Sequence, residues 1–132
     1  MTWVATHIRW IMLLAGALTC TMIYAAIAPQ AALRATFGDA LTGPVAEIVV
    51  RNWGVLITLI GVMLIYGAYQ PAVRPLVLSV AATSKIAFIV LVLSHGGQYL
   101  GHQAGVAIAV DSVMVGLFAI YLANLRRRPL TT

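Results

Sequence analysis

Two ionisable side chains lie inside long apolar stretches of this sequence and could do chemistry there. Lys85 falls near the middle of VLSVAATSKIAFIVLVLSHGG, residues 77–97, and Asp111 lies in the apolar segment that follows. An ionised group deep in a bilayer is costly, so it normally faces the interior of a helix bundle and has a partner. The lysine and the carboxylate are therefore expected to face the same interior.

The depths of the two groups favour a direct pair. At about 1.5 Å of rise per residue, Lys85 is expected roughly 15 Å, and Asp111 roughly 10 Å, below the same end of their helices. The short connection between these helices predicts that they are antiparallel neighbours. A lysine stem can bridge the remaining offset of about 5 Å by extending outward. Asp111 is thus the predicted partner of Lys85.

Further polar side chains are expected at the same end. Glu47 and Arg51 are spaced i,i+4 on one helix face, and Asn52 follows directly. Together with Lys85 and Asp111 they form the predicted polar cluster. Two interpretations stay open: a structural ion-pair network that fixes helix order, or a small polar pocket that opens outward or sideways into lipid.

A turn-rich polar segment is expected to form the rim of this cluster, with His95, Gln98, Tyr99 and His102 as its candidates. The two histidines are the best haem or metal candidates, but the glycines between them predict a turn instead of a shared helical face. Haem in a bundle usually requires histidines on facing helices. No metal or cofactor is therefore expected, and the sequence contains no nucleophile elbow, phosphate loop, dinucleotide fingerprint or zinc spacing.

The composition identifies the class of protein that must position these groups. The chain has 132 residues, of which 62% are hydrophobic and 8% charged, whereas soluble domains carry roughly 25% charged residues. The length suits a single membrane domain over residues 1–132.

Four segments are apolar enough to span a bilayer: residues 10–29, 48–69, 73–94 and 104–125. The expected fold is an all-α, antiparallel four-helix membrane bundle. The first segment follows Thr6, His7 and Arg9 as a signal peptide would, but its length and poor cleavage site favour a retained span. The connector 30–47 is expected to be either a short amphipathic helix in the membrane interface or a plain loop.

Basic residues set the expected orientation. Arg9, Arg74 and the triplet Arg126, Arg127 and Arg128 share one side, and Arg34 and Arg51 share the other. This asymmetry predicts that both termini are cytoplasmic, with a bacterial inner membrane as the expected location. The triplet is interpreted as a topology anchor that contacts lipid headgroups. Nucleic-acid binding is not expected, because three arginines after a span form no basic surface.

The layout resembles that of the small DoxX-like membrane proteins. The resemblance rests on a first span ending at Ala28-Pro29, a semi-polar connector, and a second span opened by RNWG at residues 51–54. The shared positions are Arg51, Gly54, Gly61, Gly67, Lys85 and Asp111. The resemblance implies a four-helix bundle that acts as an accessory subunit, a chaperone-like partner or a binder of small lipophilic molecules. It supplies no catalytic set, and the three glycines are expected to permit close helix packing.

The leading functional hypothesis is a membrane protein that binds a lipophilic small molecule or lipid at the polar cluster. The alternative is an accessory or assembly subunit of a larger membrane complex. A further alternative is a proton or ion pathway in a homo-oligomer, although the cytoplasmic half offers no buried ionisable residue to continue such a path. An enzyme ranks last, because no complete acid–base set is present.

Overall fold

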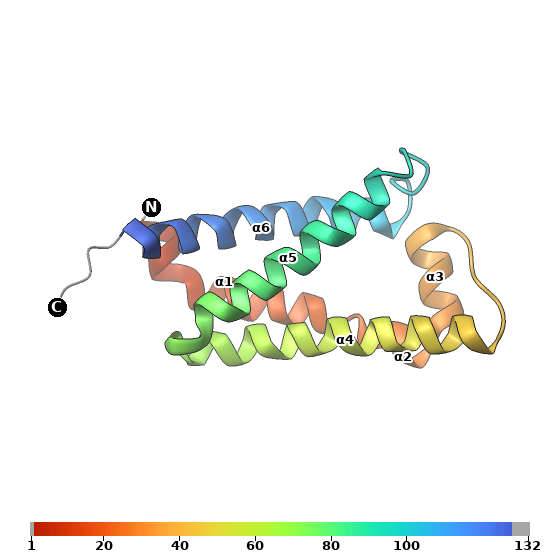
Figure 1. The fold of residues 1–132 in the computed structure, drawn as a ribbon, viewed down its shortest axis with the longest axis horizontal. Helices are drawn as coiled ribbons and strands as arrows, with labels where there is room; N and C mark the ends of the chain where they lie inside the picture. Colours follow the sequence, from red (N-terminus) through yellow and green to blue (C-terminus); the bar gives the residue numbers. More distant parts are fainter. Residues whose placement is uncertain (1, 128–132) are drawn as a thin grey trace.

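The structure is a computed structural model that describes residues 2–127, and no strand occurs in this range. Its elements are α1 (Thr2–Cys20), α2 (Ile23–Ile27), α3 (Pro29–Phe37), α4 (Pro44–Tyr69), the 3-10 turn η1 (Pro71–Val73), α5 (Arg74–Leu93) and α6 (Gln103–Arg127). Figure 1 shows the chain running away from the termini along α1, back along α4, out again along α5 and back along α6. Both described ends of the chain therefore lie at one end of the molecule.

Four helical segments are long and apolar enough to cross a membrane. They are Trp3–Ile27, Pro44–Tyr69, Pro71–Leu93 and Gln103–Arg127. At about 1.5 Å per residue each exceeds the roughly 30 Å hydrocarbon core of a bilayer. The prediction of an all-helical protein with four potential spans is confirmed at this level.

Two of the helices begin earlier in the chain than the apolar runs predicted. α1 starts at Thr2 instead of residue 10, and its first turns contact α4, where the Arg9 guanidinium carbon lies 4.7 Å from the centroid of the Tyr69 ring. α4 starts at Pro44 instead of residue 48. Proline suits the first helical turn because its missing N–H has no helical partner there, and Gly43 accommodates a φ of 108°.

The first span is broken, which the sequence did not predict. Between α1 and α2, the Thr21 N–H donates to Leu18 O and the Met22 N–H to Thr19 O, both at 3.2 Å, so the chain tightens to i→i−3 bonds. The Thr19 hydroxyl donates to Ala15 O at 2.7 Å and the Thr21 hydroxyl to Leu18 O at 2.5 Å. Hydroxyls that bond the backbone in this way compete with the helical ladder and bend it.

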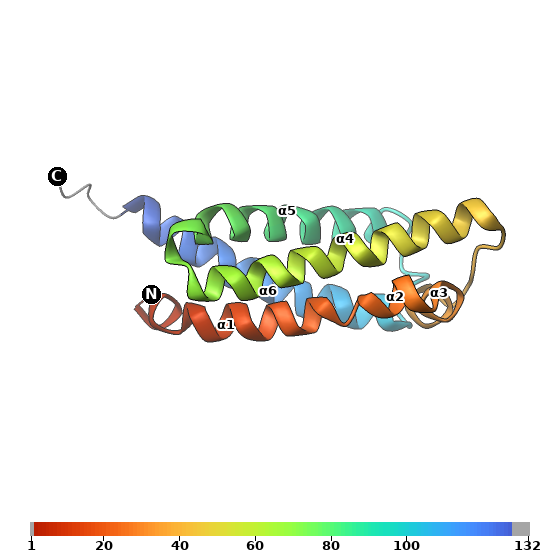
Figure 2. The ribbon, with the colours of Figure 1, turned by 90° about the horizontal axis from the view of Figure 1, so that it is seen from below.

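Figure 2 shows α1 and α2 lying alongside α4, and glycines make this approach possible. A Cβ at Gly61 would lie 2.8 Å from the Gly16 carbonyl oxygen, and one at Gly54 would lie 2.6 Å from the Ala26 nitrogen. A Cβ at Gly67 would lie 2.8 Å from the Met12 side chain. The prediction that these glycines permit close packing is confirmed, and α4 fits directly against the break.

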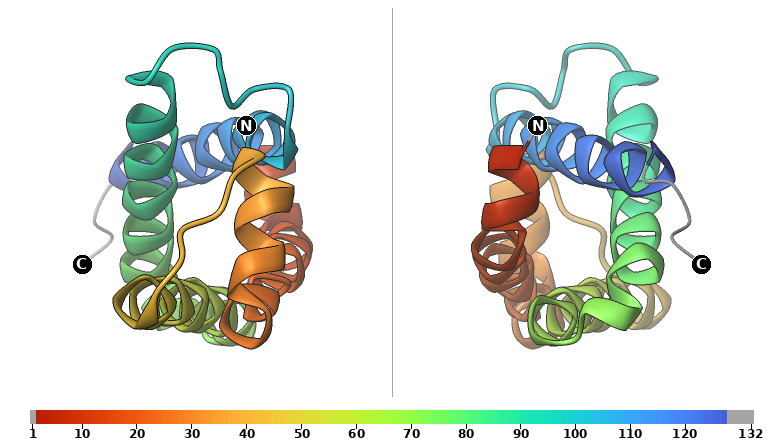
Figure 3. Two further views of the ribbon diagram at one scale, coloured as in Figure 1. Left: turned by 90° about the vertical axis from the view of Figure 1, so that its right-hand side faces the viewer. Right: turned by 90° about the vertical axis from the view of Figure 1, so that its left-hand side faces the viewer.

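The connector contains a helix, α3, followed by the non-helical residues 38–43. Pro29 opens α3, and Gly38, with a φ of 78°, ends it. Ala32 and Leu33 are buried, in a cluster that also contains Ala25 and Val50. Figures 1 and 3 show α3 standing across the end of the molecule opposite the termini.

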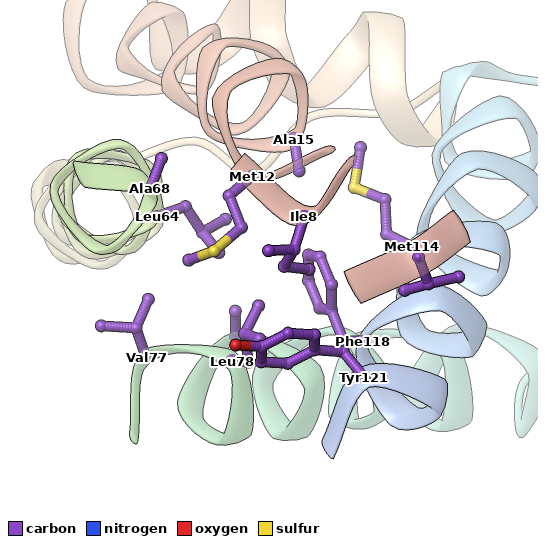
Figure 4. Close-up of a cluster of buried hydrophobic side chains, with 12 residues drawn as sticks. Ile8, Met12, Ala15, Leu64, Ala68, Val77, Leu78, Met114, Phe118 and Tyr121 are labelled. Carbon is purple, nitrogen blue, oxygen red and sulfur yellow. The ribbon is translucent and has the colours of Figure 1, made fainter. Parts of the chain in front are cut away.

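The main hydrophobic core lies in the half nearer the termini, where all four long helices contribute. Its fully buried large side chains are Met12 of α1, Leu64 of α4, Leu78 of α5 and Phe118 of α6. Figure 4 shows these side chains converging between the helices, with Tyr121 and Met114 beside them. At the other end α4 and α5 diverge from their junction at η1 (Figure 1).

Candidate functional site

Lys85 of α5 and Asp111 of α6 form a salt bridge, with Nζ 2.9 Å from Oδ1. The predicted pairing is confirmed. The two side chains are only 9% and 17% exposed, so the pair has lost most of the hydration that either charge would have in water. Within residues 2–127 this is the one salt bridge. Such a pair is costly to break, because removing one partner leaves the other charge buried.

Thr19 of α1 joins the pair and was not singled out from the sequence. Lys85 Nζ donates to Thr19 Oγ1 at 3.4 Å, while the Thr19 hydroxyl itself donates to Ala15 O. Residues from α1, α5 and α6 therefore meet at one ammonium group. The available signal was TCT at residues 19–21, where hydroxyls interrupt the apolar first span.

The pair retains unused hydrogen-bonding capacity. An ammonium carries three N–H donors, and Lys85 uses one toward Asp111 and one toward Thr19. Among the described residues no donor bonds the Oδ2 atom of Asp111. One donor and one acceptor are thus available side by side, from groups whose formal charges cancel.

Lys85 and Asp111 line a cavity of about 490 Å³, a size within the range of small-molecule sites. Its polar lining consists of Thr19, Thr21, Thr36, Lys85, Gln103 and Asp111. Its largest apolar contributors are Leu18, Met22, Ile57, Phe88, Val106 and Met114. We call this space the inner cavity. Polar side chains gather around the ion pair and at the α3 and α6 ends, while apolar side chains form most of the wall.

The inner cavity is elongated along α6. The lining residues of this helix run from Gln103 through Val106 and Val110 to Met114, at intervals of three or four residues that place them on one face. The run covers about 16 Å of helix at 1.5 Å per residue. The site is therefore an elongated slot parallel to α6, open where its lining residues Leu18 and Val106 are exposed.

A second space, which we call the outer cavity, measures about 400 Å³. It lies between α3, residues 39–41 and the last turns of α5, and its wall includes Leu33, Leu41, Leu91 and Val92. Asp39, His95 and Tyr99 are the polar residues that line it. Phe88 lines both cavities.

Aromatic rings fill the junction between the two cavities. The Phe37 ring, at the end of α3, meets Tyr99 edge-on with centroids 5.5 Å apart. The same ring lies 6.4 Å from Phe88 and 6.3 Å from Trp53. Trp53 of α4 thus contacts the ring that connects α3 to α4 and α5.

Three members of the predicted polar cluster lie elsewhere. Glu47, Arg51 and Asn52 are exposed on α4 and line neither cavity. Arg51 Nη1 donates to the carbonyl oxygen of Ala26 at 2.6 Å. The carbonyls in the last turn of a helix lack intrahelical donors, so the end of α2 supplies the acceptor that Glu47 was expected to provide.

The predicted rim residues divide between two surroundings. His95 and Tyr99 line the outer cavity, and Gln98 Nε2 donates to the His95 carbonyl at 3.1 Å. The His102 ring lies against Gly38, where an added Cβ would overlap it. Within the described part of the chain, no group of three or more His, Cys, Asp or Glu residues could hold a metal ion.

Fold and site together define an all-helical protein with four helices suited to crossing a membrane and a buried ion pair that opens into a slot. No protein-family model matches the chain, and no curated protein or solved structure matches it either.

Proposed function

We propose that the protein binds one uncharged lipophilic molecule in the inner cavity, with a hydroxyl or carbonyl group of that molecule at Lys85 and Asp111. The observation that carries this proposal is a salt bridge whose two residues retain hydrogen-bonding capacity and line a cavity of about 490 Å³. A pair that served only to join helices would gain nothing from an adjoining space of this size.

The charge balance of the site selects the ligand's head. Lys85 and Asp111 cancel formally, so a charged head would add an uncompensated charge to a poorly hydrated site. A hydroxyl can accept from the ammonium and donate to the free carboxylate oxygen at the same time, and a carbonyl can accept from the ammonium. Thr19 and Thr21 add neutral hydroxyls nearby.

The walls select the ligand's body. Apolar side chains on α1, α4, α5 and α6 line a slot about 16 Å long by helical rise. A slender hydrocarbon body lying parallel to the helices fills such a space, and it would leave lipid for an environment of similar polarity. Discrimination from bulk lipid then comes from the head, whose hydrogen bonds are worth more where water is excluded.

We further propose that the four long helices cross a bacterial inner membrane as an antiparallel bundle with both termini in the cytoplasm. Arg9, Arg74, Arg126 and Arg127 belong to the helix ends on the same side as the described chain ends. Arg128, the last residue of the predicted anchor, lies outside the described residues. In this orientation both cavities occupy the outer half of the membrane. The resemblance to DoxX-like proteins stays a prediction.

The test is extraction of the purified full-length protein followed by mass spectrometry of bound lipophilic molecules. The wild type should carry an uncharged ligand in fixed ratio. The double variant Lys85→Met/Asp111→Leu replaces the pair with apolar side chains of similar reach, which a folded protein often tolerates. It should keep its helical content and thermal unfolding but lose the ligand.

Ser112→Ala is the matched control, because Ser112 is exposed beside Asp111 and lines neither cavity. It should retain the ligand at the wild-type ratio. A wild-type protein free of ligand after purification in mild detergent, or a double variant that retains it, contradicts the proposal.

The accessory-subunit hypothesis has one specific observation in its favour. Lys85 joins α5 to both α6 and α1 through Asp111 and Thr19, so the pair also orders three helices. Under that hypothesis the double variant would lower stability, and partner proteins would copurify with the wild type in fixed ratio. The pathway hypothesis gains no comparable support, because the buried polar side chains of the described residues are Thr19 and Lys85, which lie together.

A further inference from the structure

Phe88 occupies the position that separates the two cavities. It follows Lys85 by one helical turn on α5 and therefore projects from the same face. The side chain is half-buried and lines the inner cavity on one side and the outer cavity on the other. No other residue is common to the two linings.

Neighbouring rings hold the Phe88 side chain in this position. The Phe37 ring lies 6.4 Å from it and is itself fixed edge-on by Tyr99 at 5.5 Å. Tilted and edge-on pairs of this kind are favourable arrangements of aromatic quadrupoles. Phe37 is the last residue of α3, so the helix that stands across the end of the molecule supports the partition.

The two cavities differ in chemistry, and only the inner cavity has a site for the head of the ligand. The inner cavity contains the ion pair, whereas the outer cavity is walled by Leu33, Leu41, Leu91 and Val92. Of its polar residues, Asp39 and His95 are exposed and Tyr99 is half-buried, so it contains no buried charged group. The outer cavity can therefore accept more hydrocarbon but has no second buried head site. With about 400 Å³ it nearly doubles the space open to a ligand body.

We propose that Phe88 determines ligand length, by confining the hydrocarbon body to the inner cavity and closing the outer cavity to longer chains. This inference rests on the proposed function, because it assumes a head bound at Lys85 and Asp111. From Asp111, where the head binds, the lining runs eight residues along α6 to Gln103. The ligand is accordingly an uncharged molecule whose body is about 12 Å long. A smaller side chain at position 88 joins the two compartments and admits longer molecules.

The test uses dodecanol and eicosanol carrying a photoreactive diazirine at the terminal carbon, added to the full-length protein in lipid nanodiscs. The measurement is the ratio of eicosanol labelling to dodecanol labelling. The two alcohols partition differently into the nanodisc, but this difference is the same for every variant and does not affect the comparison. In the wild type, dodecanol should label half-buried residues of the inner cavity such as Thr36 and Ala107. Phe88→Ala should raise the ratio about tenfold and move eicosanol labelling to the buried residues Leu33 and Val92 of the outer cavity.

Two further variants make the result decisive. Ile86→Ala removes a side chain of α5 that is 47% exposed and lines neither cavity, and it should leave the ratio unchanged. Phe88→Leu, which keeps more of the packing with Phe37, should raise the ratio by a smaller factor and serves if Phe88→Ala does not fold.

The outcomes distinguish a failure of this inference from a failure of the proposed function. If dodecanol labels the inner cavity but the Phe88 variants leave the ratio and the labelled positions unchanged, Phe88 does not set length and the proposed function stands. If dodecanol labelling of the inner cavity is absent from the wild type, or survives in Lys85→Met/Asp111→Leu, the proposed function itself is wrong and this inference fails with it.

Discussion

The two ends of the molecule use the same four helices in opposite ways. In the half nearer the termini, Met12, Leu64, Leu78 and Phe118 are fully buried against one another. In the other half, the same helices line a cavity of about 490 Å³, and α3, residues 39–41 and the end of α5 line a second of about 400 Å³. Close packing is the default for protein interiors, so the cavity-containing half requires an explanation and the packed half does not.

The connections explain the difference. At the packed end α4 and α5 are joined only by the short turn η1, and Arg74 donates to the carbonyls of Gly67 and Ala68 at 2.9 and 2.6 Å. At the cavity end α3 and the segments 38–43 and 94–102 lie between the long helices along the chain. Phe37 of α3 reaches both α4 and α5 through its ring contacts. The connector thus fills the gap between diverging helices incompletely, and the remaining space forms the site.

The largest expected effect comes from comparing two phenylalanines across this division. Phe118→Ala should lower the free energy of unfolding by about 3–5 kcal/mol, because Phe118 is fully buried in the packed half. Phe88→Ala should cost only about 1 kcal/mol, since that side chain is half-buried and borders both cavities, so it has fewer contacts to lose. The measurement is unfolding of each purified variant by titration with sodium dodecyl sulfate in mixed micelles. Equal losses from the two variants would show that the cavities are filled by side-chain rearrangement.

The sequence predicted the ion pair better than it predicted the cavity. Lys85 and Asp111 could be matched because regular helical rise and a short connection fix their relative depth, whatever the rest of the chain does. The cavity depends on where α3 stands and on the contact of Phe37 with Phe88, residues far apart in the chain. No local pattern encodes that contact.

The break in the first span was missed for a related reason. Residues 10–29 form an apolar run with no charge and no proline before Pro29, so hydropathy alone predicts one continuous helix. The interruption follows from the hydroxyls of Thr19 and Thr21 bonding to backbone carbonyls. Threonine often makes such bonds in a helix without breaking it. The two threonines therefore do not predict an interruption by themselves, and it follows only once the packing of α4 against residues 20–23 is known.

An intermediate effect is expected from two glycines on different surfaces. Gly61→Ala places a Cβ 2.8 Å from the Gly16 carbonyl oxygen and 2.9 Å from the Cys20 nitrogen. Both are backbone atoms, so α1 and α4 must separate, at a cost of about 1–3 kcal/mol. Gly116→Ala meets nothing within 4 Å and should stabilise by up to about 1 kcal/mol through helix propensity.

The same detergent titration measures the stability of both glycine variants. Relative to the wild type, Gly61→Ala should be less stable and Gly116→Ala more stable. A further readout links the pair to the site: because α1 carries Thr19, separation of α1 from α4 should also weaken ligand retention in Gly61→Ala and leave it intact in Gly116→Ala. Destabilisation of both variants by equal amounts would mean that α6 has a close neighbour at Gly116 that the isolated chain lacks.

The smallest expected effect distinguishes the two charged residues that were predicted to pair on α4. Arg51→Gln removes the hydrogen bond from Nη1 to the Ala26 carbonyl, made at 2.6 Å at the end of α2. Because Arg51 is exposed, the loss should be about 1 kcal/mol. Glu47→Gln removes an exposed carboxylate from the first turn of α4 and should change stability by less than about 0.5 kcal/mol. If the two residues instead act as an ion pair, both variants will lose the same amount and the double variant no more than either. If Arg51 instead stabilises the end of α2 through its hydrogen bond to the Ala26 carbonyl, only Arg51→Gln is destabilising, and adding Glu47→Gln causes no further loss.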